Sequence, residues 1–355
     1  MKIVVVVGVR PEFVQCAPLL RELKKFQEII LIHTGQHYDY EMSKQFFEQL
    51  GVPEPNYYLS VGSGNHGFQT GEMIKKLEEI MLKEMPNIVL VFGDTNSTLA
   101  GALSASKLHI KVGHIESGMR SFDKSMPEEI NRILTDHCSD LLFCSTKTAV
   151  DNLFAEGIKD DVFLTGDVMV DSLLYNQEIA ERESNIFSLL FLKKREYLVA
   201  TIHRASNTDN EENLTNIIYS FLETDEQIVF PIHPRTQISL RKFGLYEKLE
   251  NKPSIKITKP LSYLDFLKLA SNAKKILTDS GGIQKEAYIL KIPCITLREN
   301  TEWVETVEDR WNILVGADKE KILSSIQGFN PNTPQRNVFG CNSSRKIANC
   351  INFLE

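Results

Sequence analysis

The sequence predicts an α/β protein made of two doubly wound domains, and three observations support this fold class. Short apolar runs alternate with amphipathic segments along almost the whole chain, a pattern typical of parallel sheets with helices on both faces. The chain has 355 residues, too many for one ordinary core and suited to two domains of similar size. The alternation breaks once, near residues 166–175, and a polar segment at 176–188 follows before it restarts.

The first predicted strand is a run of four valines, which is typical of a strand buried on both faces. Gly8 ends the run, and Arg10-Pro11-Glu12 begins a segment with apolar residues at helical spacing. Arg10 therefore stands at the tip of a buried strand, beside a helix N-terminus that favours anions. It is either a surface arginine on an ordinary loop or a ligand for a phosphate group, and this stretch alone leaves both open.

The remaining elements continue the alternation. Predicted strands occupy residues 29–32, 88–92, 111–115 and 141–144 in the first half, and 197–202, 228–230, 255–257, 275–277, 293–297 and 312–315 in the second. Amphipathic segments, which predict helices, include residues 43–50, 69–84, 211–223 and 264–273.

Composition and charge exclude several classes of function. The net charge is −7 and the sequence has no basic stripe, so we expect no nucleic-acid partner. No apolar run approaches the length of a membrane span, and we expect neither a signal peptide nor a membrane partner. The six cysteines (16, 138, 144, 294, 341 and 350) are scattered without a CxxC pair, which is typical of a reducing compartment. We therefore expect a cytoplasmic protein.

Polar or ionisable groups follow seven of the predicted strands. In doubly wound sheets, ligands bind beyond the carboxyl ends of the strands, so these groups are the first candidates for a site. Solubility alone would allow any polar residue at these ends, and the coincidence is stronger evidence than any single motif. The groups, in chain order, are Arg10 and Glu12; Gln36 and His37; Asp94; His114, Glu116 and Arg120; His203, Arg204 and Asn207; His233 and Arg235; and Asp279 and Ser280.

The segment from Thr278 to Glu286 has the pattern of an anion site. A strand runs into Gly281-Gly282 and then a helix, so backbone N–H groups can approach a phosphate at the helix N-terminus. Glu286 lies one turn into that helix, where a carboxylate can accept both hydroxyls of a ribose. The alternative is a tight turn in which Ser280 is only the N-cap. Neither a GxGxxG fingerprint nor a P-loop is present.

Acidic residues form a second candidate group. Asp94 and Glu116 each follow a predicted buried strand, and Glu128-Glu129 begins a helix. Carboxylates confined in a cleft can have their pKa values pushed apart, which suits one to act as an acid and another as a base. For one of Glu128 and Glu129 we favour the simpler role of complementing the helix dipole. His114 and Glu116 share a strand face, but no third ligand stands at a recognisable spacing, so we expect no metal.

Seven motifs in chain order resemble the non-hydrolysing UDP-N-acetylglucosamine 2-epimerases, and the match runs roughly from residue 2 to residue 315. These motifs are VGVRPEF, HTGQH, GDTNSTLAGALSASK, GHIESGMRSFDKSMPEEINR, TIHRASNTDN, PIHPRT and LTDSGGIQKEA. The resemblance implies a glycosyltransferase-B type fold with the active site in the interdomain cleft. Residues 1–168, completed by a C-terminal helix at about 343–355, would form the domain with the catalytic carboxylates. Residues 169–342 would form the UDP-binding domain.

The resemblance also implies roles for individual residues. Arg10 would face the diphosphate from the N-terminal domain, and Ser280, Gly281, Gly282 and Glu286 would hold phosphate and ribose from the C-terminal domain. The expected catalytic residues are Asp94, Glu116, Glu128 and His203. The other expected ligands of UDP or substrate are Gln36, His37, Arg132, Arg204, Asn207, His233, Arg298 and Glu302.

The reaction implied by the resemblance is anti elimination of UDP to a 2-acetamidoglucal, followed by re-addition after protonation of the other face of C2. It interconverts UDP-N-acetylglucosamine and UDP-N-acetylmannosamine for cell-surface polysaccharide precursors and needs no cofactor. We expect a homodimer. The rival functions are a hydrolysing 2-epimerase, a glycosyltransferase of the same fold and a non-catalytic UDP-sugar sensor.

Departures from the family pattern leave the substrate open. Val9 replaces the usual threonine, and Gln15 stands where a lysine is common, which removes a positive charge near the expected diphosphate. Trp303 stands where an arginine is common, and its surroundings resemble a sister group that acts on UDP-2,3-diacetamido-2,3-dideoxyglucuronate. A tryptophan there could pack against the added acetamido methyl group, but losing a cation does not favour an extra carboxylate. We place UDP-N-acetylglucosamine first.

Overall fold

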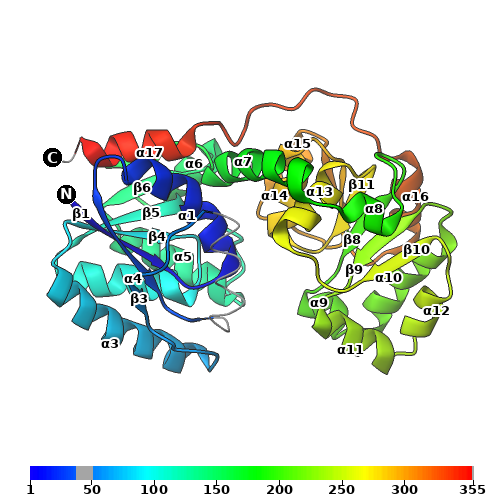
Figure 1. Cartoon of the computed structure of the whole chain (residues 1–355), viewed down its shortest axis with the longest axis horizontal. Helices are drawn as coiled ribbons and strands as arrows, with labels where there is room; N and C mark the ends of the chain where they lie inside the picture. The colour runs from blue at the N-terminus through cyan, green and yellow to red at the C-terminus, as the bar shows by residue number, and fades with distance from the viewer. Residues whose placement is uncertain (37–50, 354–355) are drawn as a thin grey trace. The chain divides into compact units, whose positions relative to one another are not determined.

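The computed structural model describes residues 1–36 and 51–353, except for the side chain of Arg10. The helix predicted at residues 43–50 lies outside the described residues. The chain forms two compact units: Met1–Leu173 with Val338–Glu355, called unit 1, and Leu174–Asn337, called unit 2. Each unit is a parallel sheet with helices on both faces, so the predicted α/β doubly wound class is confirmed (Figure 1).

The sheet of unit 1 has the strand order β3-β2-β1-β4-β5-β6-β7. Its strands are β1 (Lys2–Val7), β2 (Glu28–His33), β3 (Tyr57–Tyr58), β4 (Ile88–Phe92), β5 (Lys111–Ser117), β6 (Leu141–Cys144) and β7 (Val162–Leu164). All neighbouring strands pair in parallel. The valines of β1 are almost completely buried, as the apolar run predicted. The sequence did not predict β3 and β7, which are short strands with half-buried or exposed side chains at the two edges.

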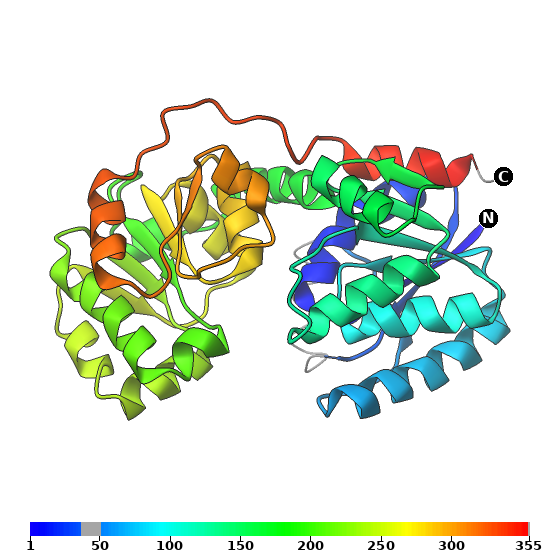
Figure 2. The same ribbon diagram turned by 180° about the vertical axis from the view of Figure 1, so that it is seen from behind.

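The helices of unit 1 are α1 (Arg10–Leu23), α3 (His66–Glu84), α4 (Asn96–Lys107), α5 (Pro127–Cys138), α6 (Lys147–Ala155) and α17 (Ser343–Asn352). Helices α3, α4 and α5 pack in sequence on one face of the sheet. The C-terminal helix α17 lies beside α1 on the other face (Figures 1 and 2). The Gln27 amide after α1 donates to Asn352 of α17 over 2.8 Å.

The sheet of unit 2 has the order β10-β9-β8-β11-β12-β13, again entirely parallel. Its strands are β8 (Leu198–Thr201), β9 (Ile228–Pro231), β10 (Ile255–Thr258), β11 (Lys275–Thr278), β12 (Cys294–Thr296) and β13 (Asn312–Leu314). Helix α7 (Val168–Glu183) continues from unit 1 into unit 2. The other helices are α8 (Ile186–Leu190), α9 (Ala205–Thr208), α10 (Glu211–Glu223), α11 (Pro234–Lys242), α12 (Tyr246–Glu250), α13 (Tyr263–Ser271), α14 (Gly281–Ile289), α15 (Val304–Glu308) and α16 (Lys319–Gly328).

Each sheet has one point where the strand order reverses direction, between β1 and β4 in unit 1 and between β8 and β11 in unit 2. Ligands of open parallel sheets bind at such switch points, beyond the carboxyl ends of the strands. The turns after these four strands carry Glu12, Asp94, His203 and Asp279. In the described part of the chain, no helix combines the length and the apolar character that a membrane crossing requires.

Candidate active site

The turn between β1 and α1 is held by the buried carboxylate of Glu12. This carboxylate accepts hydrogen bonds from the backbone N–H groups of Gly8 (2.5 Å) and Val9 (3.1 Å). It also accepts from the hydroxyls of Thr95 (2.6 Å) and Thr98 (3.2 Å) at the start of α4. One side chain, 2% exposed, thus joins the two turns that flank the switch point of unit 1.

Burial raises the pKa of Glu12 to about 7, although its four hydrogen bonds act in the opposite direction. Water normally stabilises the charged form of a carboxyl group, and its removal favours the protonated form. Glu12 therefore changes its protonation state in the neutral range.

Close packing at Gly8 fixes the position of Gln36. A Cβ atom at Gly8 would lie 2.0 Å from Oγ of Ser97 and 2.3 Å from Oγ1 of Thr34, so only glycine fits. Ser97 donates to the amide oxygen of Gln36 through its N–H (3.0 Å) and its hydroxyl (2.6 Å). Gln36 is thereby placed at the strand ends, as predicted. His37 and the side chain of Arg10, both predicted ligands, lie outside the described residues.

The structure brings together the three predicted carboxylates Asp94, Glu116 and Glu128. Burial raises the pKa of Asp94, the charge of Arg132 lowers it, and the charges of Glu116 and Glu128 raise it further; the net shift is upward. Arg132 of α5 forms an ion pair with Asp94. Three acidic groups and one arginine therefore act on one another at the carboxyl ends of β4 and β5 and the first turn of α5.

Glu116 has a strained backbone. Its φ is +72°, in the left-handed region that non-glycine residues rarely adopt, and the register of β5 against β6 shifts at this point. Such strain is typical of residues held in place for function. The Glu116 carboxylate accepts a hydrogen bond of 2.5 Å from the amide of Gln15. A Cβ atom on Gly93 would lie 3.5 Å from the same carboxylate, so the turn before Asp94 lies against Glu116.

Helix α5 separates the roles of its two adjacent glutamates. Glu129 is buried, and its carboxylate accepts from the N–H groups of Ser121 (2.8 Å) and Phe122 (2.9 Å), so it supports the preceding loop. Glu128 is half-buried in the first turn. Asn131, one turn further, donates to the carbonyl oxygen of Asp94 over 3.0 Å. Glu128, not Glu129, therefore joins the acidic group.

In unit 2, the buried carboxylate of Asp279 holds the turn after β8. It accepts from the backbone N–H groups of His203 (3.0 Å) and Arg204 (3.0 Å) and from the amide of Asn207 (3.1 Å). Asn207 also donates to the carbonyl of Leu297 over 3.0 Å. This clamp across the switch point presents the side chains of His203 and Arg204 beyond the sheet.

The His203 ring is partly exposed and favours the neutral form. Burial lowers the pKa of His203 and outweighs the nearby charge of Asp279, which acts to raise it; Arg204 and His233 lower it further. The rings of His203 and His233 are 6.0 Å apart, so two predicted ligands come together at this end of the sheet. A neutral imidazole can both donate and accept a hydrogen bond near neutral pH.

The N-terminus of α14 has the features expected of an anion site. Ser280 is its N-cap, and the hydroxyl oxygen accepts from the N–H of Ile283. Gly282 is exposed, and the atom nearest to its Cβ position is Oγ of Ser280 at 3.9 Å, so its backbone is accessible. Glu286 is half-buried one turn further along. The strand end, the two glycines and the carboxylate one turn away therefore lie together at this helix end, and their roles toward phosphate and ribose stay a prediction.

A second loop packs against this helix end. Glu302 lies 3.1 Å from the Cβ position of Gly281 and forms an ion pair of 3.0 Å with Arg298. Burial raises the pKa of Glu302, but the hydrogen bond and charge of Arg298 outweigh it and hold the pKa below its usual value. Both predicted ligands therefore lie at the α14 N-terminus as an ionised pair.

Trp303 occupies a different environment from the one the sequence suggested. Its side chain is buried, and the ammonium group of Lys285 lies 4.3 Å from the ring centre. A protein cation therefore lies over the ring, and packing of this ring against a sugar substituent stays a prediction. Sequence spacing gave no indication of this pair, which joins α14 to the loop before α15.

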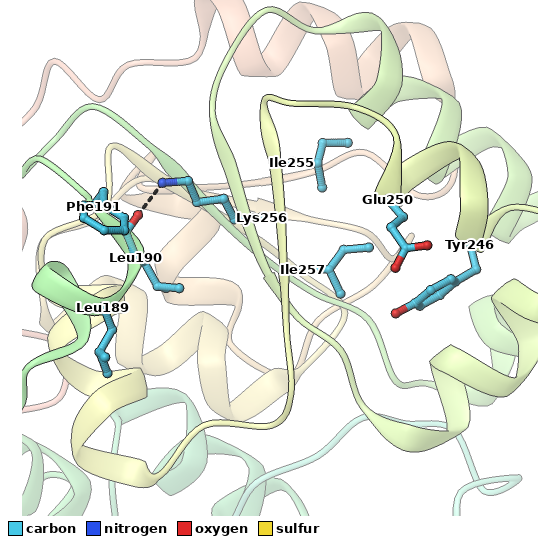
Figure 3. A pocket seen from close by; sticks show the side chains of 8 residues that line it. All are labelled: Leu189, Leu190, Phe191, Tyr246, Glu250, Ile255, Lys256 and Ile257. Carbon is cyan, nitrogen blue, oxygen red and sulfur yellow. Dashed lines mark hydrogen bonds between the residues drawn. The ribbon is translucent and has the colours of Figure 1, made fainter.

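A pocket in unit 2 lies apart from all these residues. It has a volume of about 420 Å³ and lies along the edge strand β10 (Figure 3). The ammonium of Lys256 donates to the carbonyl of Leu190 on one side of it. None of the predicted site residues lines it; its lining is Leu189, Leu190, Phe191, Tyr246, Glu250, Ile255, Lys256 and Ile257. Within the described ranges, no group of three or more His, Cys, Asp or Glu side chains is arranged so that it could hold a metal ion.

Replacing Glu12 by glutamine should remove a pH-dependent part of the stability. The pKa of Glu12 is raised from 4.5 to about 7, so the folded protein keeps a proton that the unfolded chain releases between these values. Stability therefore falls as pH rises from 4.5 to 7, by about 3 kcal/mol for this group alone. Denaturant unfolding of wild type and Glu12→Gln at pH 5, 6, 7 and 8 measures the difference. Parallel pH profiles for the two proteins would show that Glu12 does not titrate in this range.

Comparison of the sequence with known proteins identifies the family that the chain matches. A family model described as UDP-N-acetylglucosamine 2-epimerase matches residues 20–352. A UDP-N-acetylglucosamine 2-epimerase homolog of Methanococcus maripaludis is 57% identical over 357 residues, covering 100% of both chains. The UDP-2,3-diacetamido-2,3-dideoxy-D-glucuronate 2-epimerase of Pseudomonas aeruginosa is 45% identical over 335 residues, 92% of each chain.

Structural comparison agrees with the sequence relatives. The crystal structure of the Methanocaldococcus jannaschii UDP-GlcNAc 2-epimerase, in complex with UDP-GlcNAc and UDP, superposes with a TM-score of 0.90 at 48% identity. The match covers 99% of this chain and 100% of that one. The predicted glycosyltransferase-B fold class and the predicted family are therefore confirmed. The chain belongs to the UDP-N-acetylglucosamine 2-epimerase family.

Proposed function

We propose that this protein interconverts UDP-N-acetylglucosamine and UDP-N-acetylmannosamine by inverting C2 of the sugar. The observation that carries the proposal is the group of Asp94, Glu116 and Glu128, whose charges act on one another beside Arg132. Inversion at C2 needs one group that removes a proton and another that delivers one from the opposite face. Neighbouring carboxylates supply such groups, and burial together with the charges of Glu116 and Glu128 raises the pKa of Asp94.

The route we propose is elimination and re-addition of UDP. The C2–H bond has no adjacent carbonyl group, so its direct deprotonation at neutral pH is prohibitive. Loss of UDP from C1 together with the C2 proton gives a 2-acetamidoglucal. Protonation of the other face at C2 and return of UDP to C1 give the epimer. Every atom of the substrate is retained, and no oxidant, reductant or metal enters the balance.

Unit 2 binds UDP in this proposal. The N-terminus of α14, with Ser280, Gly281 and Gly282, receives a phosphate group, and Glu286 accepts hydrogen bonds from the ribose. His203, whose pKa is lowered by burial, offers a neutral N–H to the departing diphosphate. The remaining proposed ligands of nucleotide or sugar are Arg10, Gln36, His37, Arg132, Arg204, Asn207, His233, Arg298 and Glu302.

The cellular setting is part of the same proposal. All six cysteines are free, and three of them are buried, which fits a protein of the reducing cytoplasm. Assembly as a homodimer and a place in supplying precursors of cell-surface polysaccharides rest on the family resemblance.

Deuterium exchange at C2 tests the reaction. Incubation with UDP-N-acetylglucosamine in heavy water should place deuterium at C2 of a sugar that is recovered as the UDP-sugar, because UDP returns to C1 after the exchange. Glu116→Gln and Glu128→Gln should each lower the exchange rate by about 10²- to 10⁴-fold, because each change removes a proton-transfer group but keeps its shape. Mass spectrometry of the sugar nucleotide measures the exchange, and calorimetry verifies that UDP still binds.

The control is Glu78→Gln, which removes an exposed carboxylate on α3 and should leave exchange unchanged. Exchange at the wild-type rate in either active-site variant would remove that residue from the mechanism. Release of free sugar would indicate a hydrolysing epimerase, and no exchange in the wild type would indicate a glycosyltransferase or a sensor.

The nucleotide site is tested through Glu286. Glu286→Gln should weaken UDP binding by about 1.5–3 kcal/mol, because it removes a charged acceptor for the ribose hydroxyls. Calorimetric titration with UDP measures the loss. Glu247→Gln on α12, an exposed position, is the matched control. Equal UDP affinity in wild type and Glu286→Gln would show that the α14 N-terminus is only an ordinary turn.

A second substrate is favoured by one comparison. The Pseudomonas relative, 45% identical, is named for UDP-2,3-diacetamido-2,3-dideoxy-D-glucuronate. Trp303 and its surroundings in the sequence resemble the enzymes that act on this diacetamido-uronate. The buried Trp303 ring contacts Lys285, however, and a tryptophan adds no cation for the extra carboxylate. We therefore keep UDP-N-acetylglucosamine as the first substrate.

The two substrates can be compared directly. We expect kcat/KM for UDP-N-acetylglucosamine to exceed that for the diacetamido-uronate, since Trp303 stands where an arginine is common and supplies no charge for a C5 carboxylate. Initial rates with each sugar nucleotide, measured side by side under one condition, decide the question. A large preference for the diacetamido-uronate would overturn our choice.

A further inference from the structure

The side chain of Gln15 joins helix α1 to the strand end that carries Glu116. Gln15 lies in α1, one turn after Glu12, and it is 4% exposed. Its amide Nε2 donates a hydrogen bond of 2.5 Å to Oε2 of Glu116, although the two residues are 101 positions apart in the sequence. An amide nitrogen only donates and a carboxylate oxygen accepts, so the direction of this hydrogen bond is fixed. Helix α1 therefore presents a donor to one of the three proposed proton-transfer groups.

Both side chains of this pair pack against the turn that leads to Asp94. A Cβ atom on Gly93 would lie 3.5 Å from Oε2 of Glu116 and 4.0 Å from Oε1 of Gln15. Gly93 has a φ of +62°, a conformation that favours glycine. The hydrogen-bonded pair therefore lies directly against the turn between β4 and α4, and a shift of Gln15 would change the space that Glu116 has there.

The position of the Gln15 donor is itself well fixed. Residues 12–20 of α1 are all buried. Glu12, one turn earlier, accepts hydrogen bonds from the turn after β1 and from two hydroxyls at the start of α4. A side chain on a packed helix holds its partner more accurately than a side chain on a loop does. Gln15 can therefore restrict where the Glu116 carboxylate lies.

The backbone of Glu116 explains why such a restriction is needed. Its φ of +72° lies in the left-handed region, which a non-glycine residue adopts only when its surroundings hold it there. The register of β5 against β6 shifts between Ile115 and Ser117, so regular strand pairing is interrupted at this residue. The hydrogen bond from Gln15 holds the end of the side chain from outside the strand.

We propose that Gln15 is a positioning residue for the reaction at C2, because its amide holds the Glu116 carboxylate in the place from which that group transfers a proton. The inference rests on the proposed function, in which Glu116 is a proton-transfer group. Gln15 acts through Glu116 and contacts no reacting atom in this assignment. The sequence pattern alone had pointed elsewhere, to a place for position 15 near the diphosphate.

The chemistry of the amide defines which substitutions are informative. A glutamine donates a hydrogen bond without adding a charge. A lysine, the residue common at this position in the family pattern, also donates but brings a positive charge. A methionine has an unbranched side chain of similar length and no N–H donor. Position 15 can therefore keep a donor, exchange it for a charged donor or lose it, with little change in length.

Gln15→Met tests the proposal by removing the donor. We expect kcat for deuterium exchange at C2 to fall by about 10- to 100-fold, since a small displacement of a reacting group can cost about 100-fold in rate. The KM for UDP-N-acetylglucosamine and the calorimetric affinity for UDP should stay at the wild-type values. Gln327→Met, at an exposed position on α16, is the matched control and should leave kcat unchanged.

Gln15→Lys tests whether the donor itself matters. Its ammonium group can reach the same carboxylate, so we expect kcat to recover most of the loss seen in Gln15→Met. A lysine variant as slow as the methionine variant would overturn the proposal, because the loss would then come from disturbed packing of α1. If Gln15→Met does not fold, as judged by circular dichroism, Gln15→Asn replaces it, since the shorter amide does not reach Glu116.

The remaining outcomes separate this inference from the proposed function. Absence of exchange in the wild type would overturn the function and this inference together. Exchange by the wild type with an unchanged kcat in Gln15→Met would overturn the positioning role alone. A loss of UDP affinity in Gln15→Met with kcat unchanged would also overturn it, and would assign position 15 to the nucleotide.

Discussion

Buried carboxylates that accept hydrogen bonds from backbone N–H groups hold the turns on which the proposed site depends. Glu12 accepts such hydrogen bonds from the turn after β1, and Asp279 accepts them from the turn after β8. Asp136 and Glu129 do the same for the chain that follows β5. Parallel strands bring several turns to one sheet edge, where their N–H groups have no ladder partner. An ionised or hydrogen-bonded carboxylate satisfies two such groups at once, which fixes the turn without a regular element.

This support leaves a second set of carboxylates available for chemistry. Asp94 and Glu116 come from the same strand ends, and each contacts another side chain, Arg132 and Gln15 respectively. In unit 2 the corresponding division lies between Asp279, which is fully buried, and Glu286, which is half-buried on α14. Each unit thus combines fully buried carboxylates that hold turns with half-buried carboxylates near the same strand ends.

The sequence predicted those features that depend on local pattern. The valine run predicted β1, and polar residues after buried strands predicted Asp94 and Glu116 at a common sheet edge, because parallel strands end there. Glu128 was a candidate because Glu128-Glu129 begins a helix. Contacts between distant positions could not be predicted. Glu12 accepts hydrogen bonds from Thr95 and Thr98, and Trp303 contacts Lys285. These partners are brought together by the tertiary fold, and the spacing of residues in the sequence does not indicate them. The left-handed backbone conformation of Glu116 could not be predicted either, because glycine is the residue that indicates such a conformation in a sequence.

The packing around Gly8 bears on how freely the sequence of this site can drift. A single methyl group there would collide with the hydroxyls of Ser97 and Thr34, and Ser97 in turn holds Gln36. An alanine at Gly8 would therefore disturb three loops through one steric clash, whereas exposed neighbours such as Pro11 meet no such restriction. The shape of this edge of the sheet is set by the backbone and by the absence of a side chain. A random substitution at position 8 would therefore be tolerated much less well than one at the exposed positions around it. Recombination between relatives would preserve this packing only where residues 8, 34–36 and 97 come from the same parent sequence.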